Sequence, residues 1–264
     1  TQKRTKKNAP PPFITSLLQQ EAFRRLRYSA KKTMSVAQSL YEGVSLGKKG
    51  LVGLITYMRT DSFNLSNDAI SQARTYIEKV FGKDFLPDKP NRFKSRKGAQ
   101  EAHEAIRPTS VDLSPKIISR YLNRDQLALY ELIWKRFVAC QMSPAQLDKT
   151  QVEIKAGNAG FRATGSVMVF KGFTILYQER KETPNAKTKQ QNGADTPLPP
   201  LTKGQILTLM KLDPAQHFTQ PPPRFTEASL VKALEENGIG RPSTYAAILA
   251  NISGREYVSV EKRR

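Results

Sequence analysis

The chain has few of the residues that form disulfides and histidine metal sites. Its 264 residues include one cysteine, Cys140, and two histidines, His103 and His217. A single thiol cannot form an intramolecular disulfide and is typical of a reducing compartment. The two histidines are far apart and lack the spacing of a metal-ligand set. These absences exclude a disulfide-stabilised fold, and we expect no metal site among these residues.

Acidic residues and long apolar runs are also scarce. No apolar run is long enough for a transmembrane helix and no signal peptide is visible, so we expect no membrane partner. Lys and Arg number 43 against 23 Asp and Glu, which gives a formal net charge of +20 at pH 7. An excess of this size predicts a polyanionic partner, and nucleic acid before any other. A generally basic surface, as on ribosomal proteins, is the alternative.

The first half of the chain has the apolar periodicity of helices. Residues 1–12 precede it and are basic and proline-rich, which is typical of a linker. A loop rich in glycine and lysine, Val44–Gly50, leads into an apolar strand that carries Tyr57. The predicted helices are Ser16–Leu26, Thr33–Glu42, a helix capped by Ser66 and ended by Gly82, and Asp125–Met142.

The pattern changes at about Ser143, where strand-like alternation begins. The predicted strands are Thr150–Lys155, Phe161–Phe170, Gly172–Gln178 and Gln205–Leu212, with a hairpin turn at Gly157–Gly160. Helices return at Thr226–Asn237 and Ser243–Ile252, before a short strand at Glu256–Val260. Residues 16–58 and 226–260 both resemble a helix-turn-helix with a strand wing, a shape that often binds DNA, although chance similarity of short helix pairs is an alternative.

These patterns predict an α+β fold with several parts. A chain of 264 residues is long enough for two or three modest domains. The expected parts are a basic linker over residues 1–12, a mainly helical, winged-helix-like domain over 13–143, an antiparallel β-rich domain over 144–217, and part of a second helical domain over 218–264.

The segment Leu51–Ser62 carries the strongest chemical pattern. An apolar run leads to Tyr57, and Arg59 follows two residues later. Side chains two residues apart on a strand point the same way, and an unpaired arginine is costly in a core, so the pair favours a functional surface. A phenol beside a guanidinium suits attack on a phosphodiester, because arginine neutralises the charge on the phosphoryl oxygens. A strand tyrosine packed in the core is the ordinary alternative.

A second cluster surrounds His103 in the segment Ala99–Thr109. Glu101, Glu104 and Arg107 are its charged neighbours. An imidazole near a scissile phosphate can relay a proton or hold a phosphate oxygen. A loop histidine that is satisfied by a carboxylate is the alternative.

A third cluster occupies the segments Arg224–Val231 and Gly238–Tyr245. Backbone N–H groups of a helix that begins near Ser243 can bind a phosphate, and an adjacent arginine, hydroxyls and a stacking tyrosine can bind DNA. Ordinary capping of the two helices is the alternative, and the two roles are compatible. The predicted DNA contacts in this cluster are Arg224, Thr226, Arg241, Ser243, Thr244 and Tyr245.

The motifs Gly53-Leu-Ile-Thr-Tyr-Met-Arg-Thr-Asp-Ser62, Gln100-Glu-Ala-His-Glu-Ala-Ile-Arg-Pro108 and Gly238-Ile-Gly-Arg-Pro-Ser-Thr-Tyr245 resemble those of bacterial DNA topoisomerase I, the type IA family. The segments Pro12–Gln20 and Phe137–Met142 fit the same family, so the match covers almost the whole chain in order. The resemblance implies that Tyr57 attacks single-stranded DNA, keeps the 5′ phosphate as a phosphotyrosine, and releases it by religation after strand passage. This chemistry needs no ATP.

The resemblance also implies roles for other residues. Arg59 corresponds to the family's phosphate-holding arginine, His103 to its relay histidine, and Arg241 to the DNA groove. We add Thr56, Asp61 and Arg107 as expected DNA contacts near the tyrosine. The implied protein is a cytoplasmic monomer of the bacterial nucleoid that acts on single-stranded and negatively supercoiled DNA.

One part of the family's pattern is missing from the sequence. The family binds Mg²⁺ through an Asp-x-Asp motif and a separate Glu of an N-terminal Toprim domain, and neither the motif nor the domain is present. We therefore expect a central fragment that needs Mg²⁺ and the Toprim domain from the rest of the protein. The prediction is that this fragment alone binds single-stranded DNA weakly and does not cleave it. A non-catalytic module that binds single-stranded DNA is the alternative interpretation.

Overall fold

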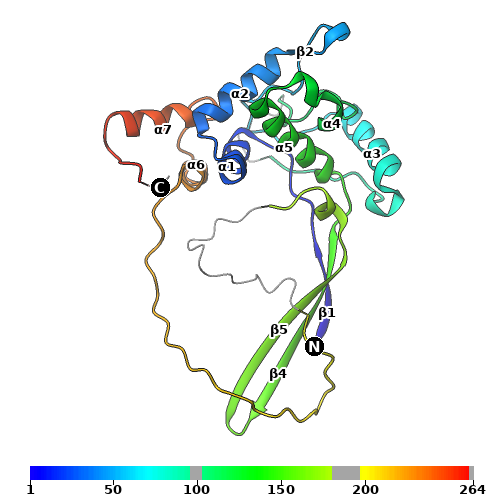
Figure 1. Ribbon diagram of the computed structural model, residues 1–264, viewed down its shortest axis with the longest axis vertical. Coiled ribbons are helices and arrows are strands. Elements are labelled where there is room, and N and C mark those ends of the chain that lie inside the picture. The colour runs from blue at the N-terminus through cyan, green and yellow to red at the C-terminus, as the bar shows by residue number, and fades with distance from the viewer. Residues whose placement is uncertain (96–102, 180–196, 262–264) are drawn as a thin grey trace. The chain divides into compact units, whose positions relative to one another are not determined.

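The computed structural model describes residues 1–95, 103–179 and 197–261, and Figure 1 shows their helices and strands. The chain divides into two compact units, which are described separately below. Unit 1 comprises Thr1–Lys7, Ala145–Lys171 and Thr183–Arg224. Unit 2 comprises Asn8–Pro144, Gly172–Glu182 and Phe225–Arg264. The combination of helices with an antiparallel sheet confirms the α+β class predicted from the sequence.

Unit 2 is mainly helical. Its α-helices are α1 (Thr15–Leu26), α2 (Ala30–Glu42), α3 (Asn67–Phe81), α4 (Pro115–Ile118), α5 (Arg124–Cys140), α6 (Glu227–Glu236) and α7 (Tyr245–Gly254). Short 3-10 turns are η1 (Gly47–Lys49), η2 (Lys83–Phe85), η3 (Ser119–Tyr121) and η4 (Gly172–Ile175). Two short strands, β2 (Val44–Ser45) and β3 (Leu51–Val52), form an antiparallel pair around η1. The long helices predicted for the first half of the chain are thus confirmed, and α2 begins three residues earlier than expected.

Residues at the helix ends account for where these helices start and stop. The Ser66 hydroxyl accepts a hydrogen bond from the Ala69 N–H at 3.2 Å, which confirms the predicted cap of α3. Asn123 and Gln126 form a reciprocal capping box at the start of α5. Such caps satisfy N–H groups that have no partner within the helix. At Gly82 the φ angle is +94°, a conformation that favours glycine and ends α3 as predicted.

The core of unit 2 is built around α5. The helices α1, α2, α3 and α4 all contact it, and the side chains of Ile133 and Phe137 are buried among them. The Trp134 indole donates a hydrogen bond to the Val111 carbonyl at 2.9 Å, so the polar end of this large side chain is also satisfied. Cys140 ends the helix and is fully buried, and burial raises the pKa of its thiol to about 12.

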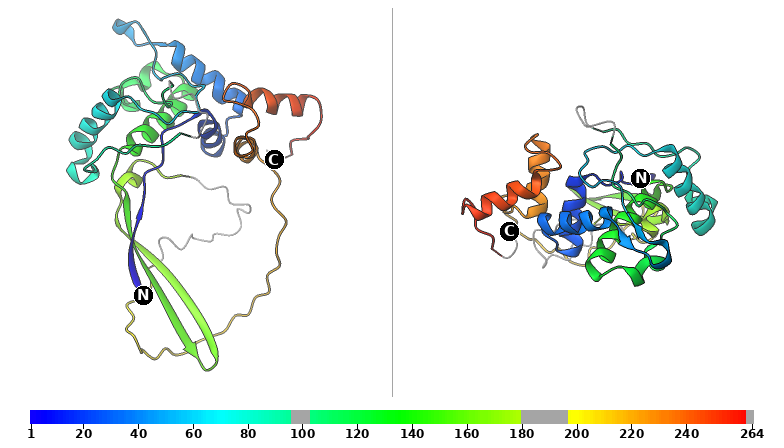
Figure 2. Two further views of the ribbon diagram at one scale, coloured as in Figure 1. Left: turned by 180° about the vertical axis from the view of Figure 1, so that it is seen from behind. Right: turned by 90° about the horizontal axis from the view of Figure 1, so that it is seen from above.

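The helices α6 and α7 pack on the first two helices, α6 on α1 and α7 on α2 (Figures 1 and 2). A small apolar cluster holds them, formed by Ala30, Val231, Tyr245 and Leu249. The Glu227 carboxylate accepts a hydrogen bond from the Ala30 N–H at 2.8 Å. These contacts join residues from the two ends of the chain in one unit.

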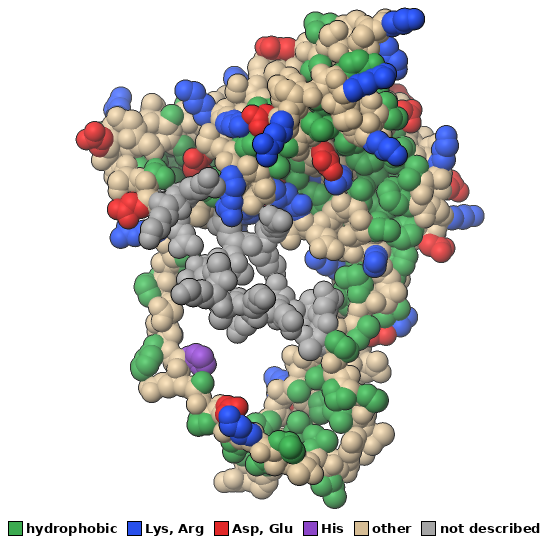
Figure 3. Space-filling view, in the orientation of Figure 1, with side chains coloured by type: hydrophobic (Ala, Val, Ile, Leu, Met, Phe, Trp, Pro, Cys, Tyr) green, Lys and Arg blue, Asp and Glu red, His purple; other side chains and the backbone are tan. Residues whose placement is uncertain are grey.

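Unit 1 contains a three-stranded antiparallel sheet in the order β1–β4–β5. Its strands are β1 (Gln2–Lys7), β4 (Ala145–Ala156) and β5 (Ala159–Phe170). Gly157 has a φ angle of +61° in the tight turn between β4 and β5, which confirms the predicted hairpin. Apolar residues face one another across the hairpin, as at Ile154 and Phe161, and Figure 3 shows hydrophobic side chains gathered over these strands.

Four expectations about strands and linkers were wrong. The expected linker over residues 1–12 begins with β1, because its backbone pairs with β4 and Arg4 forms a two-pronged ion pair with Asp148 at 2.8 and 2.9 Å. The expected strand Gly172–Gln178 begins as the 3-10 turn η4, where Phe173 is buried. The predicted strands at 205–212 and 256–260 are absent, because neither segment has a paired neighbour in the part of the chain that the structure describes.

Among the described residues, no helix combines the length and the apolar character that crossing a membrane requires.

Candidate active site around Tyr57

The Tyr57 and His103 motifs lie side by side in unit 2. Ile55 and Pro108 form an isolated antiparallel bridge. The Thr56 N–H donates to the Arg107 carbonyl at 2.9 Å, and the Thr56 hydroxyl donates to the Ala105 carbonyl at 2.7 Å. Two segments about 50 residues apart in sequence are thereby fixed against each other, as the family resemblance implied for Tyr57 and His103.

Tyr57 itself does not lie on a strand, which corrects one detail of the prediction. The strand β3 ends at Val52, and the segment from Thr56 to Arg59 has an irregular backbone. Met58 is nevertheless buried, whereas Tyr57 is 42% exposed and Arg59 is exposed. The exposure of Tyr57 and Arg59, with Met58 buried between them, agrees with the expectation that both side chains face the surface, although the segment is not a strand.

Thr15, at the start of α1, is the anchor of this irregular segment. The Thr15 hydroxyl donates to the Met58 carbonyl at 2.7 Å and accepts from the Thr60 N–H at 2.9 Å. The Thr15 N–H donates to the Thr60 carbonyl at 3.0 Å. Thr15 and Thr60 are both buried, so water does not compete for the hydrogen bonds that hold the backbone on either side of Arg59.

The side chain of Tyr57 packs against two other rings. Its ring centroid is 6.1 Å from that of His103, with an angle of 73° between the planes. On α2, Tyr41 lies 5.5 Å from Tyr57 at an angle of 65°. Both pairs have the edge-to-face geometry that aromatic rings prefer. The structure thus brings together the predicted nucleophile and the predicted relay histidine, and adds a tyrosine that the sequence did not suggest.

An ion pair holds the loop that carries His103. The Arg107 guanidinium lies 2.6 Å from the Glu104 carboxylate, which also accepts the Ser66 N–H at 2.6 Å. Partial burial alone would raise the pKa of Glu104, but these charged and N–H partners outweigh it and lower that pKa. Arg107 also donates to the Pro108 carbonyl at 3.0 Å. Arg107 therefore stabilises this loop, and its expected contact with DNA stays a prediction.

The predicted DNA-binding loop before α7 is held mainly by its own backbone. The Arg241 N–H donates to the Thr244 hydroxyl at 2.7 Å, and the Thr244 N–H donates to the Arg241 carbonyl at 2.8 Å. Gly240 has a φ angle of +79°, and a Cβ there would lie 2.9 Å from Ile248. Arg241 and Ser243 are exposed beside the helix start, so both are available to a ligand.

Two details of this cluster differ from expectation. Tyr245 is only 6% exposed and lies in the apolar cluster between α6 and α7, so its ring is not available to stack on a base. The residue before α7 is Thr244, and no side chain caps this helix, so the alternative in which Ser243 is the cap does not hold. By contrast, Thr226 caps α6 in a reciprocal pair with Ser229, as the capping alternative predicted.

Two expected contacts are less closely tied to this site. Arg224 is exposed and belongs to unit 1, and Asp61 is half-buried four residues after Tyr57. Figure 3 shows Lys and Arg side chains spread over the visible face of unit 2, with some Asp and Glu among them. This distribution is compatible with a nucleic-acid partner but does not single out one groove.

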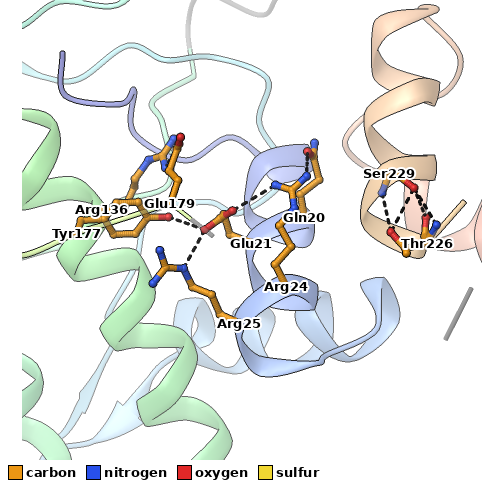
Figure 4. A network of polar contacts seen from close by, with 9 residues as sticks. All are labelled: Gln20, Glu21, Arg24, Arg25, Arg136, Tyr177, Glu179, Thr226 and Ser229. Atoms are coloured by element: carbon orange, nitrogen blue, oxygen red, sulfur yellow. Dashed lines mark hydrogen bonds and ion pairs between the residues drawn. The ribbon is translucent and has the colours of Figure 1, made fainter. Parts of the chain in front are cut away.

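A buried polar network surrounds Glu21 of α1, and the sequence did not suggest it (Figure 4). The Glu21 carboxylate accepts from Arg25 at 2.9 Å, from Arg24 at 3.2 Å and from the Tyr177 hydroxyl at 2.9 Å. Burial opposes ionisation of Glu21, but its hydrogen bonds to Arg25, Tyr177 and Arg24 prevail and lower its pKa. Burial also raises the pKa of Tyr177 to about 12. The network therefore keeps the Glu21 carboxylate ionised and hydrogen-bonded, and it ties α1 to Tyr177.

Arg136 links this network to the chain before α1. It is 2% exposed and donates to the Pro11 carbonyl at 2.6 Å and to Glu179 at 2.8 Å. Its guanidinium also lies over the rings of Phe13 and Tyr177, at 4.9 and 5.0 Å from their centroids. In the sequence, Arg136 falls on the otherwise apolar face of a predicted helix. That position could have indicated that this arginine is buried.

Within residues 1–95, 103–179 and 197–261, no group of three or more His, Cys, Asp or Glu residues has the arrangement of a metal site. Glu101, the acidic neighbour of His103 in sequence, lies outside the described residues.

Comparison with known proteins gives consistent results. A family model described as DNA topoisomerase matches residues 1–264. DNA topoisomerase 1 of Xylella fastidiosa (strain Temecula1) is 52% identical over 265 residues, covering 100% of this chain and 32% of that protein. DNA topoisomerase 1 of Rickettsia felis is 50% identical over 265 residues, covering 99% of this chain and 33% of its own length. The chain spans about a third of the length of these curated relatives.

A solved structure is also similar throughout. Full-length topoisomerase I from Thermotoga maritima matches with a TM-score of 0.82 and 38% sequence identity. The match covers 100% of this chain and 41% of that one.

Proposed function

Because the chain belongs to the DNA topoisomerase family, whose model matches all of its residues, we propose that it is the nucleophile-bearing part of a type IA enzyme. The observation that carries this proposal is the position of Tyr57, which is exposed, lies beside His103, and stands on a segment locked by the buried Thr15. An exposed phenol on a rigid backbone is suited to attack a bound phosphodiester.

The reaction is a reversible transesterification. The Tyr57 oxygen attacks phosphorus, a tyrosine–phosphate bond forms on the 5′ side, and the bond from phosphorus to the 3′ oxygen breaks. The phenol proton leaves and the departing 3′ oxygen takes up a proton, so protons balance over the step. Religation reverses each change. Because the phosphotyrosine conserves the phosphodiester bond, no ATP is needed, and passage of a strand through the gap relaxes negative supercoils.

Arg59 and His103 have separate roles in this proposal. Arg59 follows Tyr57 on the same locked segment and is exposed, so it can neutralise the charge that builds on the phosphoryl oxygens. His103 touches the phenol ring and can exchange a proton with it or with a phosphate oxygen.

DNA binding would extend beyond these residues. The exposed Arg241, Ser243 and Thr244 lie at the start of α7, where backbone N–H groups and hydroxyls suit a phosphate. The formal charge of +20 favours single-stranded and supercoiled DNA alike through its phosphates. Further contacts proposed near the cleavage site or in the flanking chain are Thr56, Asp61, Arg107, Arg224 and Thr226.

The family resemblance implies Mg²⁺, but the residues described here do not form a site that fits it. We therefore assign the metal to the partner Toprim domain and derive no step through it. On this basis the chain alone, as a monomer, binds single-stranded DNA and forms no covalent adduct. We place the whole protein in the bacterial cytoplasm, at the nucleoid.

A chimera tests the proposal directly. This chain replaces the matching third of the Xylella fastidiosa topoisomerase, and covalent adducts with labelled single-stranded DNA are trapped with Mg²⁺. The chimera should form adducts, and Tyr57→Phe should abolish them. Tyr257→Phe, which removes an exposed phenol elsewhere, should leave them unchanged. Adducts that persist in Tyr57→Phe would assign the nucleophile to another residue. A chimera that binds DNA but never forms an adduct would favour a non-catalytic binding module.

A further inference from the structure

We propose that Tyr41 is a positioning residue that holds the Tyr57 phenol in the orientation required for attack. This inference rests on the proposed function of Tyr57. It concerns a residue 16 positions earlier in the chain, on a different element, which is brought to the site by the packing of α2.

The Tyr57 side chain needs such support because it is 42% exposed. The backbone bonds of Thr15 fix its main chain but leave rotation about the side-chain bonds free. Its ring contacts are with Tyr41 and His103, at 5.5 and 6.1 Å between centroids. Tyr41 of α2 and His103 of the neighbouring loop therefore both restrict the ring.

Tyr41 can do this because its own backbone is tied to the nucleophile segment. The Leu54 N–H donates to the Leu40 carbonyl at 2.8 Å, three residues before Tyr57. A Cβ on Gly53 would lie 2.8 Å from the Tyr41 carbonyl oxygen, closer than side chains tolerate. Glycine at this position is thus what allows the end of α2 and the Tyr57 segment to approach so closely.

The rest of α2 is also anchored. Leu40 is fully buried, and the Ser39 hydroxyl accepts from the Gln126 side chain of α5 at 3.2 Å. The Tyr41 ring is therefore delivered by a rigid helix end, although it is itself 40% exposed. An exposed ring that packs on another exposed ring contributes little to the core, so its orientation is better explained by what it does to Tyr57.

The test uses the chimera described above and separates binding from chemistry. Tyr41→Leu should lower the single-turnover rate of adduct formation on bound DNA by on the order of tenfold, because a misplaced nucleophile loses near-attack geometry. The affinity for the DNA should stay within about twofold, since the ring acts on Tyr57 and not on the strand. Tyr41→Phe, which keeps the ring, should restore the rate. Gly53→Ala should reproduce the loss, because it displaces the Tyr41 backbone.

A second measurement does not depend on activity. With 3-fluorotyrosine at position 57, the ¹⁹F resonance of the intact chain should move in Tyr41→Leu and stay in place in Tyr41→Phe. Tyr121→Leu is the matched control, because Tyr121 packs with Arg120 and not with Tyr57.

Three outcomes would overturn the inference: an unchanged rate in Tyr41→Leu, an unmoved ¹⁹F resonance, or a loss of affinity that equals the loss of rate. The last outcome would indicate that the Tyr41 ring contacts a DNA base rather than positioning Tyr57. Failure of the proposed function is distinguishable, because adducts would then either survive Tyr57→Phe or be absent even with tyrosine at both positions 41 and 57.

Discussion

The segment around Tyr57 and the loop around Arg241 are both glycine-containing, both exposed and both proposed to meet DNA, yet they are held in opposite ways. The Tyr57 segment depends on Thr15, which is more than 40 residues away, and on the loop near Arg107. The Arg241 loop is closed by Thr244, three residues away. The proposed site for chemistry is thus fixed by contacts with distant segments, whereas the proposed binding loop is fixed by contacts within itself.

Replacing the exposed arginine in each region should give the largest contrast. In the chimera, Arg59→Ala should lower cleavage of bound DNA by on the order of 10²-fold, because a charge partner of the transition state is lost. Its DNA affinity should change much less. Arg241→Ala should do the reverse. It should weaken DNA binding and reduce the slope of the logarithm of the binding constant against the logarithm of salt concentration by about 1, while cleavage of bound DNA is retained. Single-turnover rates and binding at several salt concentrations measure both. Equal losses of rate and affinity in Arg59→Ala would contradict a transition-state role.

Removing one hydroxyl in each region compares their anchors. Thr15→Val should lower the free energy of unfolding by about 2 kcal/mol, because the buried Met58 carbonyl and Thr60 N–H lose their partner. Thr244→Val should cost less than about 1 kcal/mol, because its partners are exposed to water. Urea denaturation of the intact chain gives both values. If the two variants were equally destabilised, the contrast between remote and local support would not hold.

The smallest effect should be a dependence on pH that only the Tyr57 region shows. Glu104 has a lowered pKa in the fold, so its carboxylate contributes stability above the ordinary glutamate pKa of about 4.3. That contribution disappears as the pH falls through the lower, folded-state pKa. Glu104→Gln should therefore be about 1 kcal/mol less stable than wild type at pH 7, and the difference should disappear once the pH is below the folded-state pKa of Glu104.

Thermal unfolding across this pH range provides the measurement. Thr244→Val serves as the control, because the bonds that close its loop involve no titratable group. A difference between Glu104→Gln and wild type that stayed constant with pH would show that the carboxylate is not the group responsible.

Local patterns in the sequence were enough to predict the helices and the hairpin, whereas the association of Tyr57 with His103 came from the motif resemblance. Ser66, Gly82 and Gly157 act through their own neighbours, so their effects could be seen in the chain itself. The motif resemblance then gave Tyr57 its chemical context. Membership of the DNA topoisomerase family, implied by these motifs, is confirmed by the family match over the whole chain.

What could not be predicted depends on contacts between distant residues. Thr15 reads as an ordinary helix start until Met58 and Thr60 are brought to it. Tyr245 looked like an exposed stacking ring, although Leu249, four residues on, already placed it on the apolar face of α7. The alternation at 205–212 predicted a strand, yet Ile206 is 93% exposed, because periodicity cannot supply a partner strand.

The buried thiol of Cys140 has a practical consequence. Its pKa of about 12 and its complete burial keep it from reacting as a thiolate in the folded protein. Because the sequence contains no other cysteine, one introduced at an exposed position would be labelled selectively without first removing the native one. A fluorophore on the Arg241 loop or beside the Tyr57 segment would then report on each region separately as DNA arrives.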